Sequence, residues 1–574
     1  MGAVNDRPAS SHARVFDRRY AVAVGLAFAG VTGFALWILS SRFGIDTPSL
    51  IDDWLFATAP APSFGDQVQF FFEPTLGRFR PTYEIFSLAQ WHTFGAPQDM
   101  LVPNIFAVVR SVGFCVAVVA VPGLVVATGR PGIGPWLLGG LCLAAGLIIF
   151  SNPVTDGNFL SQGAQEPLLV GTLVTGLALV AWATGRLLGD PRSTVITWVP
   201  LIGGFLIWSL GIYYKEASVV MLVGAPFLYL HLDRRWRESG LIQSPLWRQR
   251  CFQLVTAAML VPAVHVMIGI TAFVEGGAGY YGAEQPSSLS GWIERGLDAA
   301  DVVWDTSAFA GLTEWRYILA GLIVAVVVVA VRDRKVPWLP AGCLVTGVAL
   351  TVFQGLLLEL SPRYLLPGIG LFTIAGVLLL AELPPWLGWP TVAAALAITA
   401  MDAREVRDGN ELYARWQEGE TGALEIVNRL NPATCPVYMK NMGGEIGDAL
   451  PKVIGLLEEP PGVTPCPRGF EGMIVGFDNP PVTPYLVDDS AIRACADRGG
   501  PALVHRSEGA EGIPQGAIEI RGCRNFAKRL DGRPTSLLLD RNRLVPGVGI
   551  SAYREGECAR RNGAEACVVL HEPG

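Results

Sequence analysis

Charged residues are scarce in this sequence. Only 16 % of its 574 residues are Asp, Glu, Lys or Arg, whereas soluble globular proteins carry about 25 %. The deficit is concentrated between about residues 20 and 400, and charged residues become frequent from about residue 402 onward. Because 51 % of all residues are hydrophobic, the scarcity indicates that lipid surrounds much of the chain. We therefore expect a membrane part followed by a soluble part.

Several familiar functional signatures are absent as well. The sequence contains no HExxH motif, no GxSxG motif and no P-loop, and nothing in it indicates ATP hydrolysis. It has no face rich in lysine or arginine, so nucleic acid is not an expected partner. His265 lies within an apolar segment and is interpreted as a satisfied core histidine, and the other histidines lack metal-ligand spacing.

The ten cysteines are unevenly distributed and include no CxxC pair of the kind that zinc sites favour. Four lie in or beside apolar segments, where they are small hydrophobic residues: Cys115, Cys142, Cys251 and Cys343. Six lie in the soluble tail: Cys435, Cys466, Cys495, Cys523, Cys558 and Cys567. An even number in the tail favours disulfides and therefore an oxidising compartment. The alternative is six free thiols in the cytosol.

Apolar segments of about 20 residues predict membrane-spanning helices. We identify about eleven of them, near residues 20–42, 101–128, 135–151, 166–185, 195–213, 217–232, 251–273, 316–331, 337–358, 364–381 and 388–401. The first is not followed by a clear cleavage site, so we interpret it as a span and not as a signal peptide.

The basic residues of the short loops predict the orientation of these spans. They precede the first span and follow the fourth, sixth and eighth, which places all of them on one side of the membrane: Arg14, Arg18, Arg19, Arg186, Arg192, Arg234, Arg235, Arg237, Arg248, Arg250, Arg332, Arg334 and Lys335. That side is expected to be cytoplasmic. The prediction is a cytoplasmic segment 1–19, a transmembrane domain 20–401 and an extracytoplasmic domain 402–574 in the cell (inner) membrane. An odd number of spans exports the tail, in agreement with its cysteines.

Ionisable residues gather where the spans meet the outer face. The first outer loop carries Asp52 and Asp53, an adjacent pair in which repulsion favours a raised pKa for one carboxyl. Such a pair suits a general base, and it also suits a divalent cation such as Mg²⁺ or Mn²⁺. The same loop contains Arg78 and Arg80, whose guanidinium groups match a phosphate, and then Glu84. The alternative for the acidic pair is a helix cap or a solvated turn.

Further charges lie in the other outer connections. Glu166 begins the fourth span, where the positive end of the helix dipole favours a carboxylate. Lys215 and Glu216 lie in the very short link between the fifth and sixth spans, and Arg363 and Tyr364 open the tenth. Each alone is explained by an ordinary helix charge, an interfacial ion pair or a membrane anchor. Their concentration on one face of the membrane favours a functional site.

The order of these motifs resembles the GT-C superfamily of integral-membrane glycosyltransferases over roughly residues 20–370. The resemblance is carried by Asp52-Asp53-Trp54, Gly77-Arg78-Phe79-Arg80-Pro81, Asn152-Pro153 with Glu166, Tyr214-Lys215-Glu216, and Arg363-Tyr364-Leu365-Leu366-Pro367. The layout is most similar to bacterial relatives of the protein O-mannosyltransferases and aminoarabinose transferases. Its acidic motif is a direct Asp-Asp pair, where the family pattern is a spaced Asp-x-Asp.

The resemblance implies a transferase that takes sugar from a polyprenyl-phosphate donor on the outer face of the membrane. The acceptor would be a hydroxyl of a cell-envelope glycan, lipid or protein. Asp52 or Asp53 would be the general base of an inverting displacement. Lys215 and Arg363 would bind the donor phosphate with Arg78 or Arg80, and Glu84, Glu166, Glu216 and Tyr364 would orient these groups or bind the acceptor. Many members of the family work without a metal, so no cofactor is assigned.

Short apolar runs predict a disulfide-bonded α/β or α+β fold for the tail. We expect strands at residues 435–439, 473–477, 536–539 and near 568–570, and a helix near 408–430. Two other functions stay open. A transporter or flippase of an envelope precursor would need polar residues deep in the spans, and Arg110 inside the second span is one. A structural membrane protein with an exported binding domain leaves the charges on the outer face without a role.

Overall fold

The fold is known from a computed structural model of the whole chain. The residues that it describes are 17–40, 80–83, 101–128, 132–151, 166–189, 195–238, 246–275, 288–304, 315–357, 362–404, 406–407, 437–440, 502–505, 518–521, 558–561 and 564–567.

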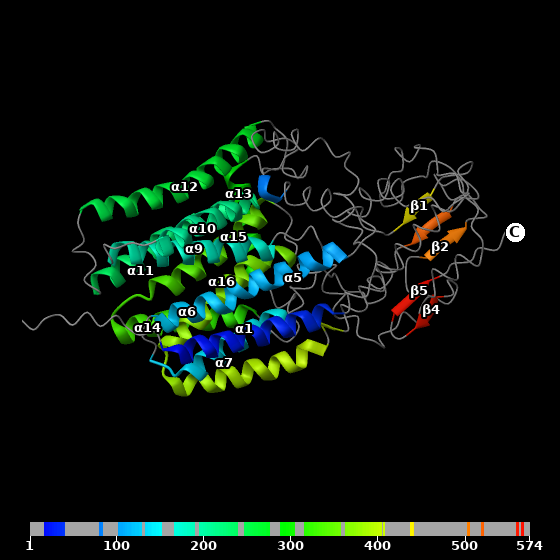
Figure 1. The fold of residues 1–574 in the computed structure, drawn as a ribbon. Coiled ribbons are helices and arrows are strands. Elements are labelled where there is room, and N and C mark those ends of the chain that lie inside the picture. The colour runs from blue at the N-terminus through cyan, green and yellow to red at the C-terminus, as the bar shows by residue number, and fades with distance from the viewer. Residues whose placement is uncertain are drawn as a thin grey trace, which may run out of the picture.

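Most of the described chain forms a bundle of long helices that lie side by side (Figure 1). Its first half contains α1 (Arg18–Leu39), α5 (Leu101–Cys115), the π-helical turn η1 (Val116–Ala120), α6 (Val121–Thr128), α7 (Pro135–Phe150), α9 (Glu166–Gly189) and α10 (Val195–Ile212). The π turn ends two residues before Pro122, which has no amide hydrogen to donate within a regular helix.

The second half of the bundle follows a short link after α10. It contains the 3₁₀ helices η3 (Glu216–Gly224) and η7 (Pro362–Leu365), together with α11 (Ala225–Glu238), α12 (Leu246–Glu275), α13 (Leu289–Trp304), α14 (Trp315–Asp333), α15 (Trp338–Leu357) and α16 (Leu366–Glu382). A further helix covers residues 385–404.

The helices identify the chain as a helical membrane protein. Within the described residues, five helices are long and apolar enough to cross a bilayer, and four shorter apolar helices accompany them. Helical segments overlap all eleven predicted spans, while the number that cross the membrane stays a prediction. Large apolar side chains face outward, including Leu254 at 69 % exposure and Val331 at 72 %. Lipid is the natural surrounding for such a surface.

Helix α16 lies in the middle of the bundle (Figure 1) and is buried along nearly its whole length. It is apolar on every side, as expected for a helix with neighbours all round. It packs closely against α15, where a Cβ added to Gly368 would lie only 2.5 Å from the Thr351 hydroxyl oxygen. Close helix approach through small residues is the usual way for membrane helices to associate.

Two small sheets occur in the tail. Strand β3 (Ile518–Arg521) pairs parallel with β1 (Val437–Lys440) and antiparallel with β2 (Ala502–His505), and β4 (Cys558–Arg561) pairs antiparallel with β5 (Ala564–Cys567). Strand β1 overlaps the strand predicted at 435–439, and β5 ends just before the one predicted near 568–570. Strands β2, β3 and β4 were not predicted. The strands expected at 473–477 and 536–539, and the helix near 408–430, lie outside the described residues.

Candidate functional site

The link between α10 and η3 places two charged residues inside the bundle. Helix α10 ends at Ile212, and the Ser218 hydroxyl donates to the Ile212 carbonyl oxygen at 2.6 Å, which closes the connection. Lys215 has extended backbone angles, with φ −156° and ψ 140°, and Glu216 begins η3. Because successive side chains on an extended backbone point to opposite sides, Lys215 and Glu216 can meet different partners. In the described structure Glu166 is an ion-pair partner of Lys215, and Arg80 is an ion-pair partner of Glu216.

Lys215 donates from its ammonium group to a carboxylate oxygen of Glu166, and the two side chains are each 3 % exposed. Glu166 is the first residue of α9, so the helix dipole also favours its negative charge. The Lys215 Nζ lies 4.2 Å from the centroid of the Tyr364 ring, a cation–π contact. This half of the site therefore joins the start of α9, the α10–η3 link and η7.

Glu216 accepts a hydrogen bond from Arg80, with Nε and Oε2 2.6 Å apart and both side chains 4 % exposed. The segment around Arg80 is held against the same link by two further contacts. The Thr82 amide donates to the Tyr213 carbonyl oxygen at 3.1 Å. The rings of Tyr83 and Tyr214 meet edge-on with centroids 5.8 Å apart. The segment at residues 80–83 thus contributes a cation to the link from 136 positions earlier in the chain.

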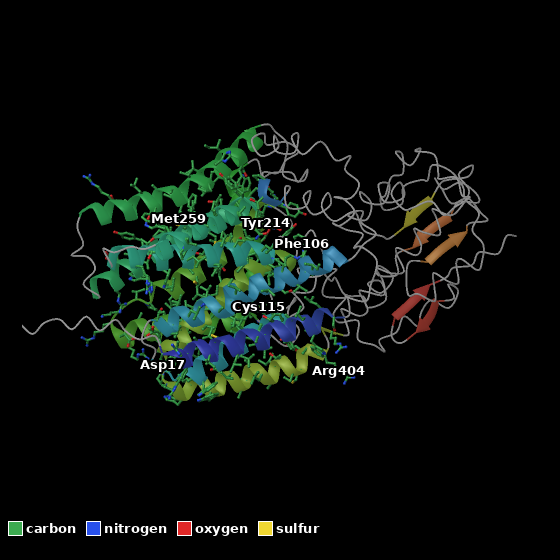
Figure 2. All side chains as sticks on the ribbon, viewed as in Figure 1. Asp17, Phe106, Cys115, Tyr214, Met259 and Arg404 are labelled. Atoms are coloured by element: carbon green, nitrogen blue, oxygen red, sulfur yellow. The ribbon has the colours of Figure 1, made fainter. Side chains whose placement is uncertain are left out.

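Arg110 adds a third cation from α5, where its side chain is 3 % exposed. Its charge acts on Tyr214 in the α10–η3 link. Burial raises the pKa of Tyr214 to about 12, with smaller effects from Arg110, which lowers it, and Glu166, which raises it. We name Arg80, Arg110, Glu166, Lys215 and Glu216 the charge cluster. Figure 2 labels Tyr214 among the helices of the bundle, and it also labels Phe106 of α5.

Among the described residues, the charge cluster contains three cations and two carboxylates. Taking a charge out of water costs several kcal/mol even after relaxation, and only pairing and hydrogen bonds offset that cost. Two buried ion pairs are therefore a weak means of stabilising a fold, since apolar side chains would serve as well or better. Ionisable groups kept at membrane depth favour a functional explanation, and several cations gathered in one buried place suit an anion.

Five of the ten predicted site residues belong to this arrangement: Arg80, Glu166, Lys215, Glu216 and Tyr364. Asp52, Asp53, Arg78 and Glu84 lie outside the described residues. For Arg363 only the backbone is described, and it lies in η7 directly before Tyr364. The roles of all ten stay predictions.

Sequence reasoning did not assign one member of the charge cluster and two residues next to it. Arg110 is recognised from the sequence as a charge within a span but is not placed in the site, although that depth is itself a signal. Tyr214 enters the sequence analysis only as part of the Tyr214-Lys215-Glu216 motif, and Tyr83 gives no signal of its own, because the contact of the two rings depends on the docking of the Arg80 segment.

The remaining candidates are His265 and possible metal ligands. His265 shares a hydrogen bond with the Tyr213 hydroxyl, at 2.9 Å from its Nδ1, in agreement with a satisfied core histidine. Within the described ranges, no group of three His, Cys, Asp or Glu side chains could hold a metal ion. Asp52 and Asp53, the candidate metal ligands, are not among those residues.

Comparisons with known proteins complete the description. No protein-family profile matches the chain, and no curated protein matches it. Among solved structures, the chain is similar to ArnT from Cupriavidus metallidurans bound to undecaprenyl phosphate. The two share 14 % sequence identity with a TM-score of 0.39, over 75 % of this chain and 84 % of that one. At this TM-score the likeness by itself assigns neither a fold family nor a function.

Proposed function

We propose that this chain is a GT-C-type membrane glycosyltransferase that moves a sugar from a polyprenyl-phosphate donor to a hydroxyl acceptor. The observation that carries the proposal is the charge cluster. Residues from four separate segments, each singled out by sequence as a candidate site residue, meet in one buried place. A buried cluster that includes Arg80, Arg110 and Lys215 suits a lipid whose headgroup is a phosphate.

In the proposed reaction the carboxylate of Asp52 or Asp53 removes the proton of the acceptor hydroxyl. The acceptor oxygen then attacks the anomeric carbon of the donor sugar, and the bond from that carbon to the phosphate oxygen breaks. The electron pair of that bond leaves with the polyprenyl phosphate, and the configuration at the anomeric carbon is inverted. Fixed cations stabilise the leaving phosphate because negative charge grows there during the displacement.

Lys215 and Arg80 are the proposed phosphate ligands, supported by Arg110 and, from η7, by Arg363. Glu166 and Glu216 hold the first two cations in place before the donor binds. They also lower the affinity for free anions, because each cation is already paired. The donor phosphate has to compete with these carboxylates, and its prenyl chain supplies the additional binding energy through apolar contact.

The test is a transfer assay with the purified full chain in detergent. Radiolabelled polyprenyl-phosphate sugars and a crude envelope acceptor are supplied to the wild type, Asp52→Asn, Asp53→Asn, Lys215→Met and Arg363→Ala. We expect label to move to the acceptor with the wild type. One Asp variant that still folds should lose at least about 100-fold in rate, as is typical when a general base is removed. Lys215→Met should weaken the binding of bare polyprenyl phosphate.

A matched control is Arg332→Gln. Arg332 belongs to an ion pair that is about 40 % exposed, contacts the Glu382 carbonyl oxygen and is predicted to lie on the cytoplasmic side. It should retain wild-type transfer. If no donor is consumed, or if both Asp variants match the wild type, the transferase proposal fails and transport of the lipid precursor becomes the leading function.

A further inference from the structure

Gln354 is a buried polar residue whose side chain has no hydrogen-bond partner in the part of the chain that the structure describes. It lies in α15 and is 1 % exposed. Neither its carboxamide oxygen nor its nitrogen has a hydrogen-bond partner in the described structure. Burying an amide without partners costs stability, and such groups are rare in native proteins unless they serve a purpose. A Leu or Met at this position would fill the same space without that cost.

The helix geometry places Gln354 beside the charge cluster. Gly347, Thr351 and Gln354 are spaced i, i+4 and i+7, so they share one face of α15. That face packs on α16, because Gly347 and Thr351 both approach Gly368. Gln354 is three residues beyond Thr351, which is about 4.5 Å further along the helix axis. Since α16 runs antiparallel to α15, this brings Gln354 to the level of Tyr364.

Tyr364 connects this position to the charge cluster, because the Lys215 Nζ lies 4.2 Å from the centroid of the Tyr364 ring. A second polar group without a hydrogen-bond partner in the described chain lies in the segment that carries Arg80. Thr82, which is 5 % exposed, stands between Arg80 and Tyr83, and its hydroxyl oxygen has no hydrogen-bond partner within the described chain. Both residues thus have unused hydrogen-bonding capacity next to paired charges.

The chemistry of a carboxamide narrows what it can recognise. Its nitrogen donates two hydrogen bonds and its oxygen accepts two. A phosphate would satisfy only the donors, since it offers acceptors. A hydroxyl group both donates and accepts, so a ring that carries hydroxyls can satisfy both ends of the side chain. Next to phosphate-binding cations, such a ring is the sugar of the donor.

We propose that Gln354 binds a hydroxyl of the donor sugar and sets the enzyme's preference for that sugar. This inference rests on the proposed function and extends it from the phosphate to the sugar. The assignment explains why a membrane helix keeps a buried amide without partners: the ligand supplies them. Thr82 is the second candidate for the same ring.

The experiment compares wild type, Gln354→Met and Gln354→Leu with the full chain in detergent. Each is assayed with the donor that the wild type uses and with analogues of it that lack one ring hydroxyl at a time. We expect both variants to lose roughly 10- to 100-fold in kcat/KM with the full donor. The wild type should use one deoxy analogue with a lower kcat/KM than the full donor, and both variants should use that analogue and the full donor with equal kcat/KM. Stabilisation by bare polyprenyl phosphate, measured as a shift in unfolding temperature, should equal that of the wild type.

Thr184 provides a matched control. It is a buried residue of α9, 3 % exposed, whose hydroxyl also has no partner in the described part of the chain. It lies 18 residues, or about 27 Å, along the helix from Glu166. Thr184→Val and Gln354→Met should both raise the unfolding temperature of the ligand-free protein, but only Gln354→Met should lower activity.

Two results would overturn the inference, and they differ from each other. If the Gln354 variants use the full donor and every deoxy analogue as the wild type does, Gln354 is only an internal packing residue while the transferase function stands. If the wild type neither consumes donor nor is stabilised by bare polyprenyl phosphate, the proposed function itself is wrong and a sugar-binding role for Gln354 falls with it.

Discussion

At the scale of single residues, the buried ion pairs are the feature that most needs explanation. Lys215 pairs with Glu166, and its neighbour Glu216 pairs with Arg80. Each pair consists of groups that are costly to bury alone. Removing one partner leaves the other charge buried, where water cannot replace the lost ion pair. Breaking a buried pair should therefore lower the free energy of unfolding much more than breaking an exposed pair of similar geometry.

We expect Glu166→Gln to lower the free energy of unfolding by about 3–5 kcal/mol, because Lys215 then loses the carboxylate placed against it. The double variant Glu166→Leu with Lys215→Met should recover most of that loss but remain inactive. The measurement is unfolding in mixed detergent and SDS micelles, followed by tryptophan fluorescence.

The control for this measurement is Asp333→Asn in the exposed pair with Arg332, whose Nε lies 2.7 Å from Asp333 Oδ1. It should change the free energy of unfolding by less than about 1 kcal/mol. The hydrogen bond from Arg332 lowers the pKa of Asp333. Its small contribution is therefore present above about pH 4 and is lost as the pH falls through the lowered pKa. Equal losses from Glu166→Gln and Asp333→Asn would contradict the assigned cost of burial.

At the scale of elements, small residues determine how closely the helices approach. Helices α9 and α10 meet through Gly176 and Gly204, whose backbones lie against each other. A Cβ on Gly204 would lie 2.8 Å from the Leu179 Cβ and 3.0 Å from the Gly176 carbonyl oxygen. Because α9 begins with Glu166 and α10 leads into Lys215, this contact also sets the distance between the two partners of one ion pair.

Gly204→Ala should destabilise the protein by roughly 1–3 kcal/mol, since the added methyl group forces the two backbones apart. Gly203 is the ideal comparison, because it is the preceding residue of the same helix and a Cβ there would meet nothing within 4 Å. Gly203→Ala should be neutral or slightly stabilising, because alanine favours helix by about 1 kcal/mol over glycine. Equal destabilisation of both variants, measured by unfolding in micelles, would argue against the close contact.

At the scale of the whole molecule, the predicted topology places the tail and the charge cluster on the same side of the membrane. The register of β4 and β5 now adds one specific pairing to that prediction. Cys558 lies directly opposite Cys567, and residues opposite each other in an antiparallel pair have Cα atoms about 4.5–5.5 Å apart. Disulfides need about 4.4–6.8 Å, so the backbone suits a Cys558–Cys567 bridge.

We expect this bridge in protein isolated under thiol-blocking conditions, detected as a linked pair of peptides that separates on reduction. Cys558→Ser should leave Cys567 available for labelling, and a periplasmic reporter fused after residue 574 should be active. Two free thiols together with an inactive reporter would place the tail in the cytoplasm and reverse the predicted orientation. The control is Cys142, which is buried in α7 and should stay unlabelled in the folded protein.

The sequence by itself determined the helical membrane part, because long apolar segments have one stable form in lipid, and helices overlap all eleven predicted segments. It also marked Arg80, Glu166, Lys215 and Glu216 as candidates, because charge near a membrane helix is costly and therefore informative. In the tail it missed β2, β3 and β4, since four-residue strands with mixed polarity carry little periodic signal.

Only the tertiary structure decided which charge meets which. Arg80 pairs with Glu216, 136 positions away in the sequence, and Lys215 pairs with Glu166, 49 positions away. A local sequence pattern carries no information about partners so far apart in the chain. The partners are chosen by helix packing, which small residues such as Gly176 and Gly204 permit. The same is true of Gln354. The sequence shows one amide in an apolar helix, and only the tertiary structure shows that this amide is buried with no hydrogen-bond partner in the described chain.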